Sequence, residues 1–307
     1  MSSEHHHHPD LKGKSLLWTI FLNIAITVAQ VIGAIFSHSL SLLTDALHNF
    51  SDVMALVISF IANKLSKKKY TPEQSYGYKR AEILAAFINA ATLLGISMYL
   101  IFEASERFVA KSGPEINASM VAWLAGFSIV ANGISVLIVK KHAGNNMNMR
   151  SAYLHLFSDM LSSIAVLAGG LLMFFFNIDW IDALLSVIIA IYLIVSSWKL
   201  MVKTIKVLMQ FTPSDINMTE IANHLKQIKL VKNVHHIHIW QLNDMEYHLE
   251  AHLDIEKDVP ISETSQIVTQ AQTLLQEKFN ISHSTIQPEF NVKDDKRMIV
   301  DERHHQH

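Results

Sequence analysis

Apolar residues in this chain are gathered into six long stretches, all of which end before residue 203. A helix that crosses a bilayer needs about 20 mostly apolar residues, and each stretch reaches that length. Charged residues become frequent again after the sixth stretch, so the pattern predicts an α-helical membrane bundle followed by a soluble part. The six predicted transmembrane helices cover residues 15–36, 40–62, 81–102, 118–139, 151–176 and 181–202.

The pattern after the sixth stretch is that of a small α+β domain. Apolar residues recur at helical spacing from Ile216 to Ile228, and alternating segments flank a turn at Asn243-Asp244. The resulting order, α-β-β-α-β, suits a small sheet with both helices on one face. The predicted elements are a helix over 216–229, strands over 234–242 and 246–255, a helix over 261–279 and a strand over 284–290.

These patterns divide the chain into four parts. Residues 1–14 form a histidine-containing N-terminus, and residues 15–208 form the six-helix transmembrane domain. Residues 209–292 form the soluble domain, and the polar residues 293–307 are expected to be a disordered tail. Only 17% of the 307 residues are charged, against about a quarter in ordinary soluble proteins, which agrees with a large membrane part.

The distribution of lysine and arginine predicts the orientation of the chain in the membrane. Basic residues favour the cytoplasmic ends of membrane helices. One set of connections is rich in them, whereas the opposite set holds only Arg107 and Lys111. Both termini and the soluble domain are therefore expected in the cytoplasm. The basic set consists of Lys12, Lys14, Lys64, Lys67, Lys68, Lys69, Lys79, Arg80, Lys140, Lys141, Arg150, Lys203 and Lys206.

Composition limits the chemistry that the chain can perform. Cysteine is absent, which excludes disulfides, thiolate nucleophiles and thiolate metal sites. The 18 histidines leave imidazole and carboxylate as the available metal ligands. The net charge of −2 gives no case for nucleic-acid binding. A signature for nucleotide binding, G-x-x-x-x-G-K-[ST], is also missing from the sequence.

A six-residue motif occurs in both the second and the fifth predicted span. Residues 47–52 read Leu-His-Asn-Phe-Ser-Asp and residues 154–159 read Leu-His-Leu-Phe-Ser-Asp, so five of the six positions are identical. In each copy histidine and aspartate are four residues apart, which places them on one face of a helix. Ionisable groups in a membrane normally face the interior of the bundle and find partners there.

The repeated motif predicts a four-ligand metal site. His48 and Asp52 from one helix with His155 and Asp159 from another offer two imidazoles and two carboxylates, a set that suits tetrahedral Zn²⁺. Nickel, cobalt and copper(II) would also bind such ligands, whereas calcium and magnesium prefer oxygen alone. The alternative is that each histidine–aspartate pair serves only to tie helices together. Asp45, one turn before His48, could be a helix cap, an ion guide or a further ligand.

These ligands also predict the energy source. Metal binding needs neutral histidine and ionised aspartate, so loading a metal ion displaces protons and protonation expels the metal. Histidine titrates near physiological pH. The expectation is an exchange of Zn²⁺ against protons that carries the metal out of the cytoplasm.

Several histidines also lie on the predicted strands of the soluble domain. His235, His236 and His238 lie on the first strand, and His248 and His252 alternate with apolar residues on the second. With His283 and Glu289 they could form a cytoplasmic metal site, or simply a solvated polar face. The histidines at the termini could collect metal loosely or belong to a purification tag: His5, His6, His7, His8, His304, His305 and His307.

The chain resembles the cation diffusion facilitator family, on its zinc-transporting branch, from about Leu16 to Glu289. The resemblance rests on the H-x-x-x-D motif in both residues 43–52 and 155–159, on Tyr-Gly-Tyr-Lys-Arg-Ala-Glu at 76–82, and on Val-His-His-Ile-His-Ile-Trp at 234–240. It implies a homodimer that works by alternating access and proton antiport. It also implies a metallochaperone-like cytoplasmic domain that dimerises and binds zinc.

The resemblance further implies which residues bind metal and where the protein is found. Transport ligands fall at His48, Asp52, His155 and Asp159, and the cytoplasmic ligands correspond to His235, His252, His283 and Glu289. Zn²⁺ is the implied substrate, with Cd²⁺, Co²⁺ and Ni²⁺ as further candidates. The connection at 142–150 is short and holds one histidine, which resembles bacterial members and implies the bacterial inner membrane.

Two other functions compete with transport. A metal sensor or structural membrane dimer without flux would also use the histidine-rich soluble domain. A membrane zinc hydrolase would need an open coordination position and a general base, whereas four ligands already close this site and no H-E-x-x-H motif is present. The chain is therefore not expected to be an enzyme.

Overall fold

The computed structural model describes residues 13–66, 70–110, 114–140, 147–243 and 245–299. The chain forms two compact units. The first contains residues 1–61 and 86–201, and the second contains residues 62–85 and 202–307.

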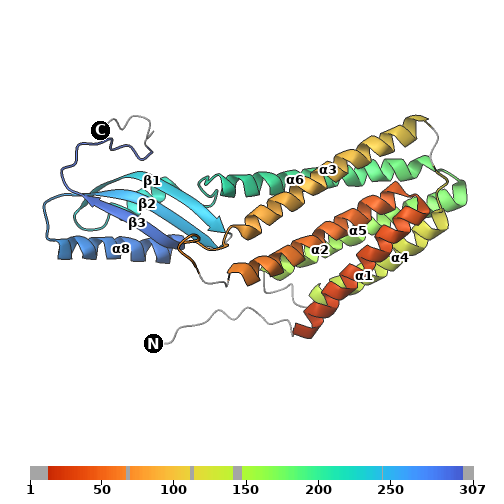
Figure 1. The fold of residues 1–307 in the computed structure, drawn as a ribbon, viewed down its shortest axis with the longest axis horizontal. Coiled ribbons are helices and arrows are strands. Elements are labelled where there is room, and N and C mark those ends of the chain that lie inside the picture. Colours follow the sequence, from red (N-terminus) through yellow and green to blue (C-terminus); the bar gives the residue numbers. More distant parts are fainter. Residues whose placement is uncertain (1–12, 67–69, 111–113, 141–146, 244, 300–307) are drawn as a thin grey trace. The chain divides into compact units, whose positions relative to one another are not determined.

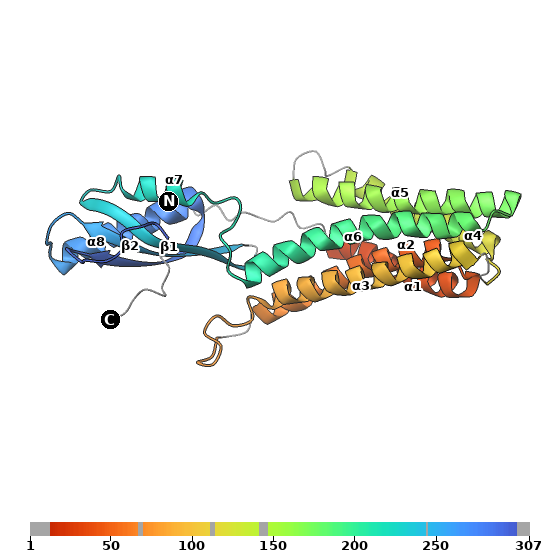
Figure 2. The same cartoon turned by 90° about the horizontal axis from the view of Figure 1, so that it is seen from above.

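The first unit is built from long helices that lie side by side (Figures 1 and 2). Within the described residues, four helical segments are long and apolar enough to cross a membrane: Ala81–Val109, Ala118–Leu137, Phe157–Phe176 and Trp180–Leu208. The first helix has a shorter apolar stretch, Asn23–Ser37. Four of the six predicted spans are therefore confirmed. The helices are α1 (Gly13–Ser37), α2 (Leu40–Ser66), α3 (Ala81–Ala110), α4 (Ala118–Lys140), α5 (Met147–Phe176) and α6 (Trp180–Leu208).

Apolar side chains of the first unit face outward as well as inward. Val109 is 82% exposed and Trp123 is 79% exposed, a pattern that would be costly in water but not in lipid. Polar side chains such as Ser97, Ser128 and Asn132 are buried between the helices. This distribution is that of an integral membrane domain.

Asp182 fixes the start of α2 against α6. Its carboxylate accepts hydrogen bonds from the backbone N–H of Leu40 at 2.7 Å and of Ser41 at 3.2 Å. It also accepts the hydroxyl of Ser39 at 2.6 Å. The first N–H groups of a helix have no partner within it, and a negative charge there is favourable. The cap therefore sets the position of the helix that carries His48 and Asp52.

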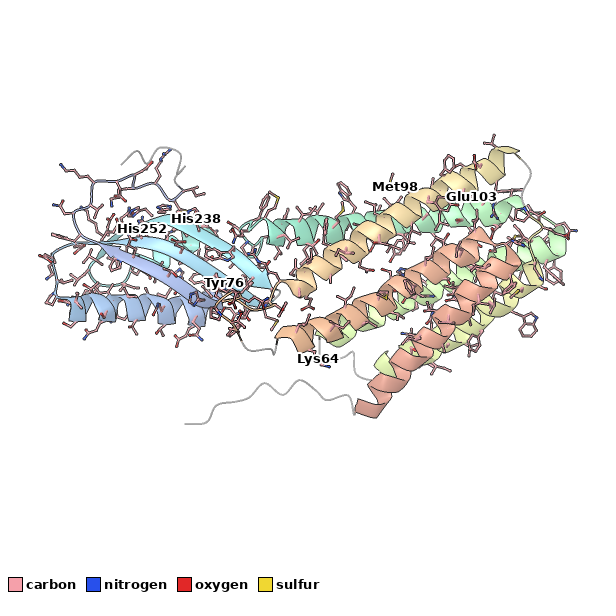
Figure 3. The ribbon with its side chains drawn as sticks, viewed as in Figure 1. Lys64, Tyr76, Met98, Glu103, His238 and His252 are labelled. Carbon is pink, nitrogen blue, oxygen red and sulfur yellow. The ribbon has the colours of Figure 1, made fainter. Side chains whose placement is uncertain are left out.

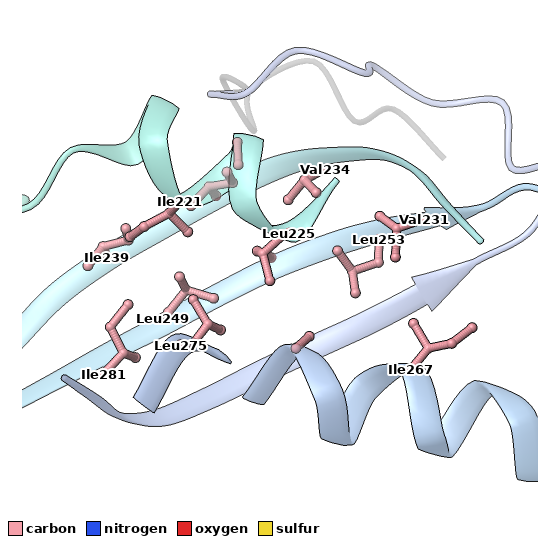
Figure 4. Close-up of a cluster of buried hydrophobic side chains, with 14 of the residues drawn as sticks. Ile221, Leu225, Val231, Val234, Ile239, Leu249, Leu253, Ile267, Leu275 and Ile281 are labelled. Carbon is pink, nitrogen blue, oxygen red and sulfur yellow. The ribbon is translucent and has the colours of Figure 1, made fainter. Parts of the chain in front are cut away.

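The second unit contains a three-stranded sheet with two helices on one face. Strand β1 pairs antiparallel with β2, and β2 pairs parallel with β3. Side chains from both helices, including Ile221 and Leu275, share one apolar core with Ile239, Leu249 and Leu253 of the sheet (Figure 4). This confirms the predicted α-β-β-α-β order. The elements are α7 (Met218–Leu225), β1 (Val231–Asn243), β2 (Glu246–Ile255), α8 (Ile261–Phe279) and β3 (Ile281–Glu289).

Residues 293–298, in the tail for which the sequence predicts disorder, include two that are hydrogen-bonded to β1. The backbone N–H of His236 donates to the carbonyl of Arg297 at 3.2 Å, and that of Ile237 donates to Met298 at 2.8 Å. The register of β1 against β2 shifts between His235 and His238, and an edge strand leaves backbone groups available for pairing. Residues 293–298, called the tail strap below, use those groups. Residues 300–307 lie outside the described part of the chain.

Helices α4 and α5 approach closely at Gly170. A Cβ atom there would lie 3.1 Å from the backbone nitrogen of Ala122 and 3.2 Å from Cγ1 of Val121. At Gly126, on α4, a Cβ atom would meet nothing within 4 Å.

Gly170→Val should therefore push α4 and α5 apart, whereas Gly126→Val should be tolerated. Overpacking of this kind costs about 1–3 kcal/mol. Thermal unfolding in detergent is the measurement, with a lower midpoint expected for Gly170→Val. Equal midpoints for the two variants would contradict the close contact.

Candidate metal sites

The first candidate site joins α2 and α5 inside the membrane unit. Nε2 of His48 lies 3.1 Å from Oδ1 of Asp159 and 3.8 Å from Oδ2 of Asp52. One ligand atom from each of the three lies within 4.8 Å of the others. His48 and Asp159 are buried, and Asp52 is partly buried. The structure thus brings together three of the four residues predicted for the transport site.

The fourth predicted residue, His155, has a side chain outside the described residues. Its backbone lies in α5, four residues before Asp159. The backbone of His155 therefore lies about one helical turn before Asp159.

Tyr192 of α6 borders the same site, which the sequence did not indicate. Its ring meets the imidazole of His48 edge-on, with 6.1 Å between ring centroids. Its hydroxyl lies 3.2 Å from the hydroxyl of Ser158, next to Asp159 in the chain. A single tyrosine in an apolar helix carries no pattern that would distinguish it from a core residue.

Asp45 of α2 is hydrogen-bonded to two other helices, α1 and α5, and does not belong to the described group of ligands. Its carboxylate accepts hydrogen bonds from Gln30 at 2.8 Å, from Ser162 at 2.7 Å and from Ser163 at 3.1 Å. Asn49 donates in turn to the side-chain oxygen of Gln30 at 2.7 Å. Asp45 is 1% exposed, so these bonds satisfy a buried charge and connect α1, α2 and α5. Of the roles open at the level of sequence, the geometry favours a structural one.

The second candidate site lies on the sheet face opposite the helices of the second unit. His235 of β1 is paired with His252 of β2, and Asp254 of β2 is paired with Glu289 of β3. His252 Nδ1 lies 2.8 Å from Glu289 Oε1, and His235 Nε2 lies 3.4 Å from Glu289 Oε2. Figure 3 shows His252 projecting from the sheet on the side away from α8.

Asp294 of the tail strap completes this second group. Its Oδ2 lies 3.0 Å from Nε2 of His235. Ligand atoms of His235, His252, Glu289 and Asp294 all lie within 4.8 Å of one another. His235 is fully buried and Glu289 is nearly so. Asp294 could not be predicted as a ligand from the sequence, because an acidic residue in a polar tail gives no signal of a site.

His283 does not join that group, contrary to the set that the resemblance implied. Gln287, not His283, is the residue of β3 opposite His252. Four strand residues span roughly 13 Å at about 3.3 Å each, so His283 lies too far along the strand. It instead faces His248, with 5.0 Å between ring centroids. Burial, and then the neighbouring His283, lower the pKa of His248.

The segment at residues 76–79, just before α3, contacts the β1–β2 hairpin within the second unit. Lys79 donates to Glu246 at 2.5 Å, and the Tyr76 ring meets that of His248 at 5.7 Å between centroids. The bond to Glu246 raises the pKa of Lys79. Burial acts to raise the pKa of Glu246, but hydrogen bonds from Lys79 and Asn243 outweigh it and hold that pKa below its usual value. These contacts attach the loop to the sheet.

Comparison with known protein families matches nearly the whole chain. Residues 16–209 match the cation efflux transmembrane domain, and residues 213–290 match the cation efflux protein cytoplasmic domain. The two matches follow one another along the chain and correspond to its apolar and soluble parts.

Individual relatives agree with the family match. A "cadmium, cobalt and zinc/H(+)-K(+) antiporter" of Bacillus subtilis is 34% identical over 287 residues, covering 93% of this chain and 91% of its own length. The "metal cation efflux system protein CzcD" of Cupriavidus metallidurans is 31% identical over 92% of this chain and 88% of its own. A "zinc transporter ZitB" of Pectobacterium atrosepticum is 29% identical over 99% of this chain and 94% of its own.

These three relatives are named as transport or efflux proteins and not as enzymes. Together with the two domain matches and the paired H-x-x-x-D helices, they confirm the resemblance found in the sequence. The chain belongs to the cation efflux family, also called the cation diffusion facilitator family, and aligns with members named for zinc transport.

Proposed function

We propose that this protein exports Zn²⁺ from the cytoplasm in exchange for protons, through a site made by His48, Asp52, His155 and Asp159. The observation that carries the proposal is the position of His48 Nε2, 3.1 Å from Asp159 and 3.8 Å from Asp52, across two helices of the membrane unit. If each histidine–aspartate pair served only to tie helices together, the side chains of the two helices would not need to converge on one point. Convergence of three ligand atoms is what a shared ion requires.

The charges of this site suit a divalent ion. Two aspartates and two neutral imidazoles together carry two negative charges, which one Zn²⁺ neutralises. Zn²⁺ accepts both nitrogen and carboxylate oxygen in tetrahedral sites. Zinc, cadmium and cobalt appear in the name of the Bacillus subtilis relative, which supports cadmium and cobalt as further substrates. Nickel as a substrate rests on ligand type alone.

Proton exchange follows from the same ligands. An incoming proton competes with the metal for imidazole nitrogen and carboxylate oxygen, so a proton gradient can drive metal release. The word antiporter in the name of the Bacillus relative supports this coupling. We propose six spans, one for each apolar stretch, and place both termini in the cytoplasm because the basic residues lie on one side of those spans. We place the protein in a bacterial inner membrane because the connection at 142–150 is short, as in bacterial members.

The cytoplasmic domain is proposed to dimerise and to bind Zn²⁺ through His235, His252, Glu289 and Asp294. Its match to the family's cytoplasmic domain supports the homodimer. The four ligand atoms within 4.8 Å support the site. A metal sensor without flux is the second candidate function, because this group would detect metal even if the membrane site carried none.

Asp159→Ala and Asp52→Ala should abolish zinc flux, because each removes a charged ligand from the shared ion. The measurement is zinc uptake into proteoliposomes that contain a zinc-sensitive dye and carry a proton gradient. A fall of at least about tenfold is expected, which corresponds to a rise of about 1.4 kcal/mol in the activation free energy of transport. Asp179→Ala, at an exposed aspartate before α6, is the control and should retain flux.

Flux that survives both substitutions would refute the membrane site. If the unmodified protein also shows no zinc flux, while its cytoplasmic group still binds zinc, the result would favour the metal sensor.

Asp45 and Asp159 should respond differently to the same substitution. Asp159→Asn weakens a ligand, so zinc affinity should fall by about tenfold or more. Asp45→Asn cannot accept from Gln30, Ser162 and Ser163 as the carboxylate does, so it should lower the thermal midpoint while zinc affinity changes by less than about threefold. Affinity is read by competition with a chelator and stability by thermal unfolding. A loss of affinity for Asp45→Asn equal to that of Asp159→Asn would make Asp45 a ligand.

His48→Asp should change selectivity. The variant replaces a nitrogen ligand by oxygen, so discrimination against cadmium and manganese should relax. The ratio of cadmium to zinc transport in the same vesicles measures this, and the ratio should rise. An unchanged ratio would show that ligand type at residue 48 does not set selectivity.

A further inference from the structure

A lysine side chain reaches into the cytoplasmic group of ligands. Nζ of Lys296 lies 2.7 Å from Oδ1 of Asp254 and 3.2 Å from Oε2 of Glu289. It also contacts the carboxylate of Asp294, and it lies 3.5 Å from Nε2 of His235. The ammonium therefore touches three carboxylates and comes close to a buried imidazole. Two of those carboxylates belong to the proposed ligand set.

Successive side chains of the tail strap alternate between contacting this group and pointing elsewhere. Its carbonyl groups at Arg297 and Met298 accept hydrogen bonds from β1. Asp294 and Lys296 contact the group, whereas Asp295 and Arg297 pair with each other. Alternation of this kind is the geometry of an extended segment. The strap thus delivers one metal ligand and one cation to the same place.

A zinc ion and the ammonium would use the same carboxylates. The ligand atoms of the group lie within 4.8 Å of one another, and Zn²⁺ would need each of them at about 2.0–2.2 Å. The ammonium already contacts two of these carboxylates, those of Glu289 and Asp294. Asp254, Glu289 and Asp294 carry three negative charges, which would repel one another if no cation were present.

We propose that Lys296 is a tethered cation that fills the cytoplasmic metal site when zinc is absent, competes with zinc for it, and so sets the zinc concentration at which the site loads. Zinc entry displaces the ammonium into solvent, while Asp294 of the same strap stays as a ligand. The inference rests on the proposal that His235, His252, Glu289 and Asp294 bind zinc. It does not depend on transport through the membrane site.

Competition by a tethered group predicts the direction in which zinc affinity changes when that group is removed. Lys296 is about one third exposed, so releasing it to water is feasible, but its ion pairs must be broken first. Lys296→Gln removes the competing charge and leaves the carboxylates with no internal cation. Zinc should then bind more tightly, and at a lower free concentration.

The test uses the full chain in detergent with Asp159→Ala, so that the membrane site contributes little zinc binding. Zinc affinity is measured by competition with a chromophoric chelator. Lys296→Gln should raise the affinity by about tenfold, whereas Lys293→Gln, at an exposed lysine of the same strap, should leave it unchanged. An affinity that is unchanged or lower in Lys296→Gln would overturn the proposal.

A second measurement needs no substitution at Lys296. Amine acetylation of the otherwise unmodified protein is followed by mass spectrometry with and without zinc. Lys296 should react slowly without zinc and several times faster with it, because zinc releases its amine, while Lys293 reacts at the same rate in both. A rate for Lys296 that is unaffected or slowed by zinc would also overturn the proposal.

The two proposals can fail separately. If the cytoplasmic group binds no zinc in any variant while zinc flux persists, the tethered cation is wrong and transport stands. If Lys296→Gln tightens zinc binding but the unmodified protein shows no flux, the membrane site is wrong and the tethered cation stands.

Discussion

Charged groups in the interior of a membrane domain must find partners there, and this requirement organises the first unit. His48, Asp52 and Asp159 converge within 4.8 Å, and the divalent cation that we propose for this site would neutralise the two carboxylates. The exposed surface around them is apolar. The same requirement explains why the other buried aspartates are fully hydrogen-bonded. Asp182 caps α2, and Asp45 accepts bonds from α1 and α5. These two residues hold the helix that carries His48 in place without taking part in the proposed ion site.

Carboxylates gathered in the second unit also have partners, and one of these partners is a cation of the chain itself. Asp254, Glu289 and Asp294 lie on or beside a sheet face with His235 and His252, and Lys296 supplies a positive charge from within the chain. Burial acts to lower the pKa of Lys296, but its hydrogen bonds to the three carboxylates outweigh burial and raise that pKa, so the ammonium stays charged. In the membrane unit, by contrast, the two ion pairs given above join histidine to aspartate. One unit thus carries an internal cation at its candidate site, and the other relies on the ion that it is proposed to transport.

Local patterns in the sequence predicted most of the fold and three residues that the structure brings together in the membrane unit. The four-residue spacing of His48 and Asp52 is a property of one helix, and its repetition at His155 and Asp159 indicated that two helices share a function. The α-β-β-α-β order followed from periodicity alone. Contacts that depend on register could not be predicted. The parallel pairing of β2 with β3 puts Gln287, not His283, opposite His252, and no local signal specifies that pairing. The tail strap depends on the irregular register of β1 near His236, so Asp294 and Lys296 were assigned to a disordered tail.

The central claim is that two helices of the membrane unit bind one ion between them. Diffraction data at the zinc absorption edge, from crystals grown with Zn²⁺, test this most directly. The expected result is an anomalous peak about 2.0–2.2 Å from His48 Nε2 and from carboxylate oxygens of Asp52 and Asp159, with a nitrogen of His155 completing the shell. Zinc peaks found only elsewhere, with these side chains bonded to one another instead, would contradict the claim.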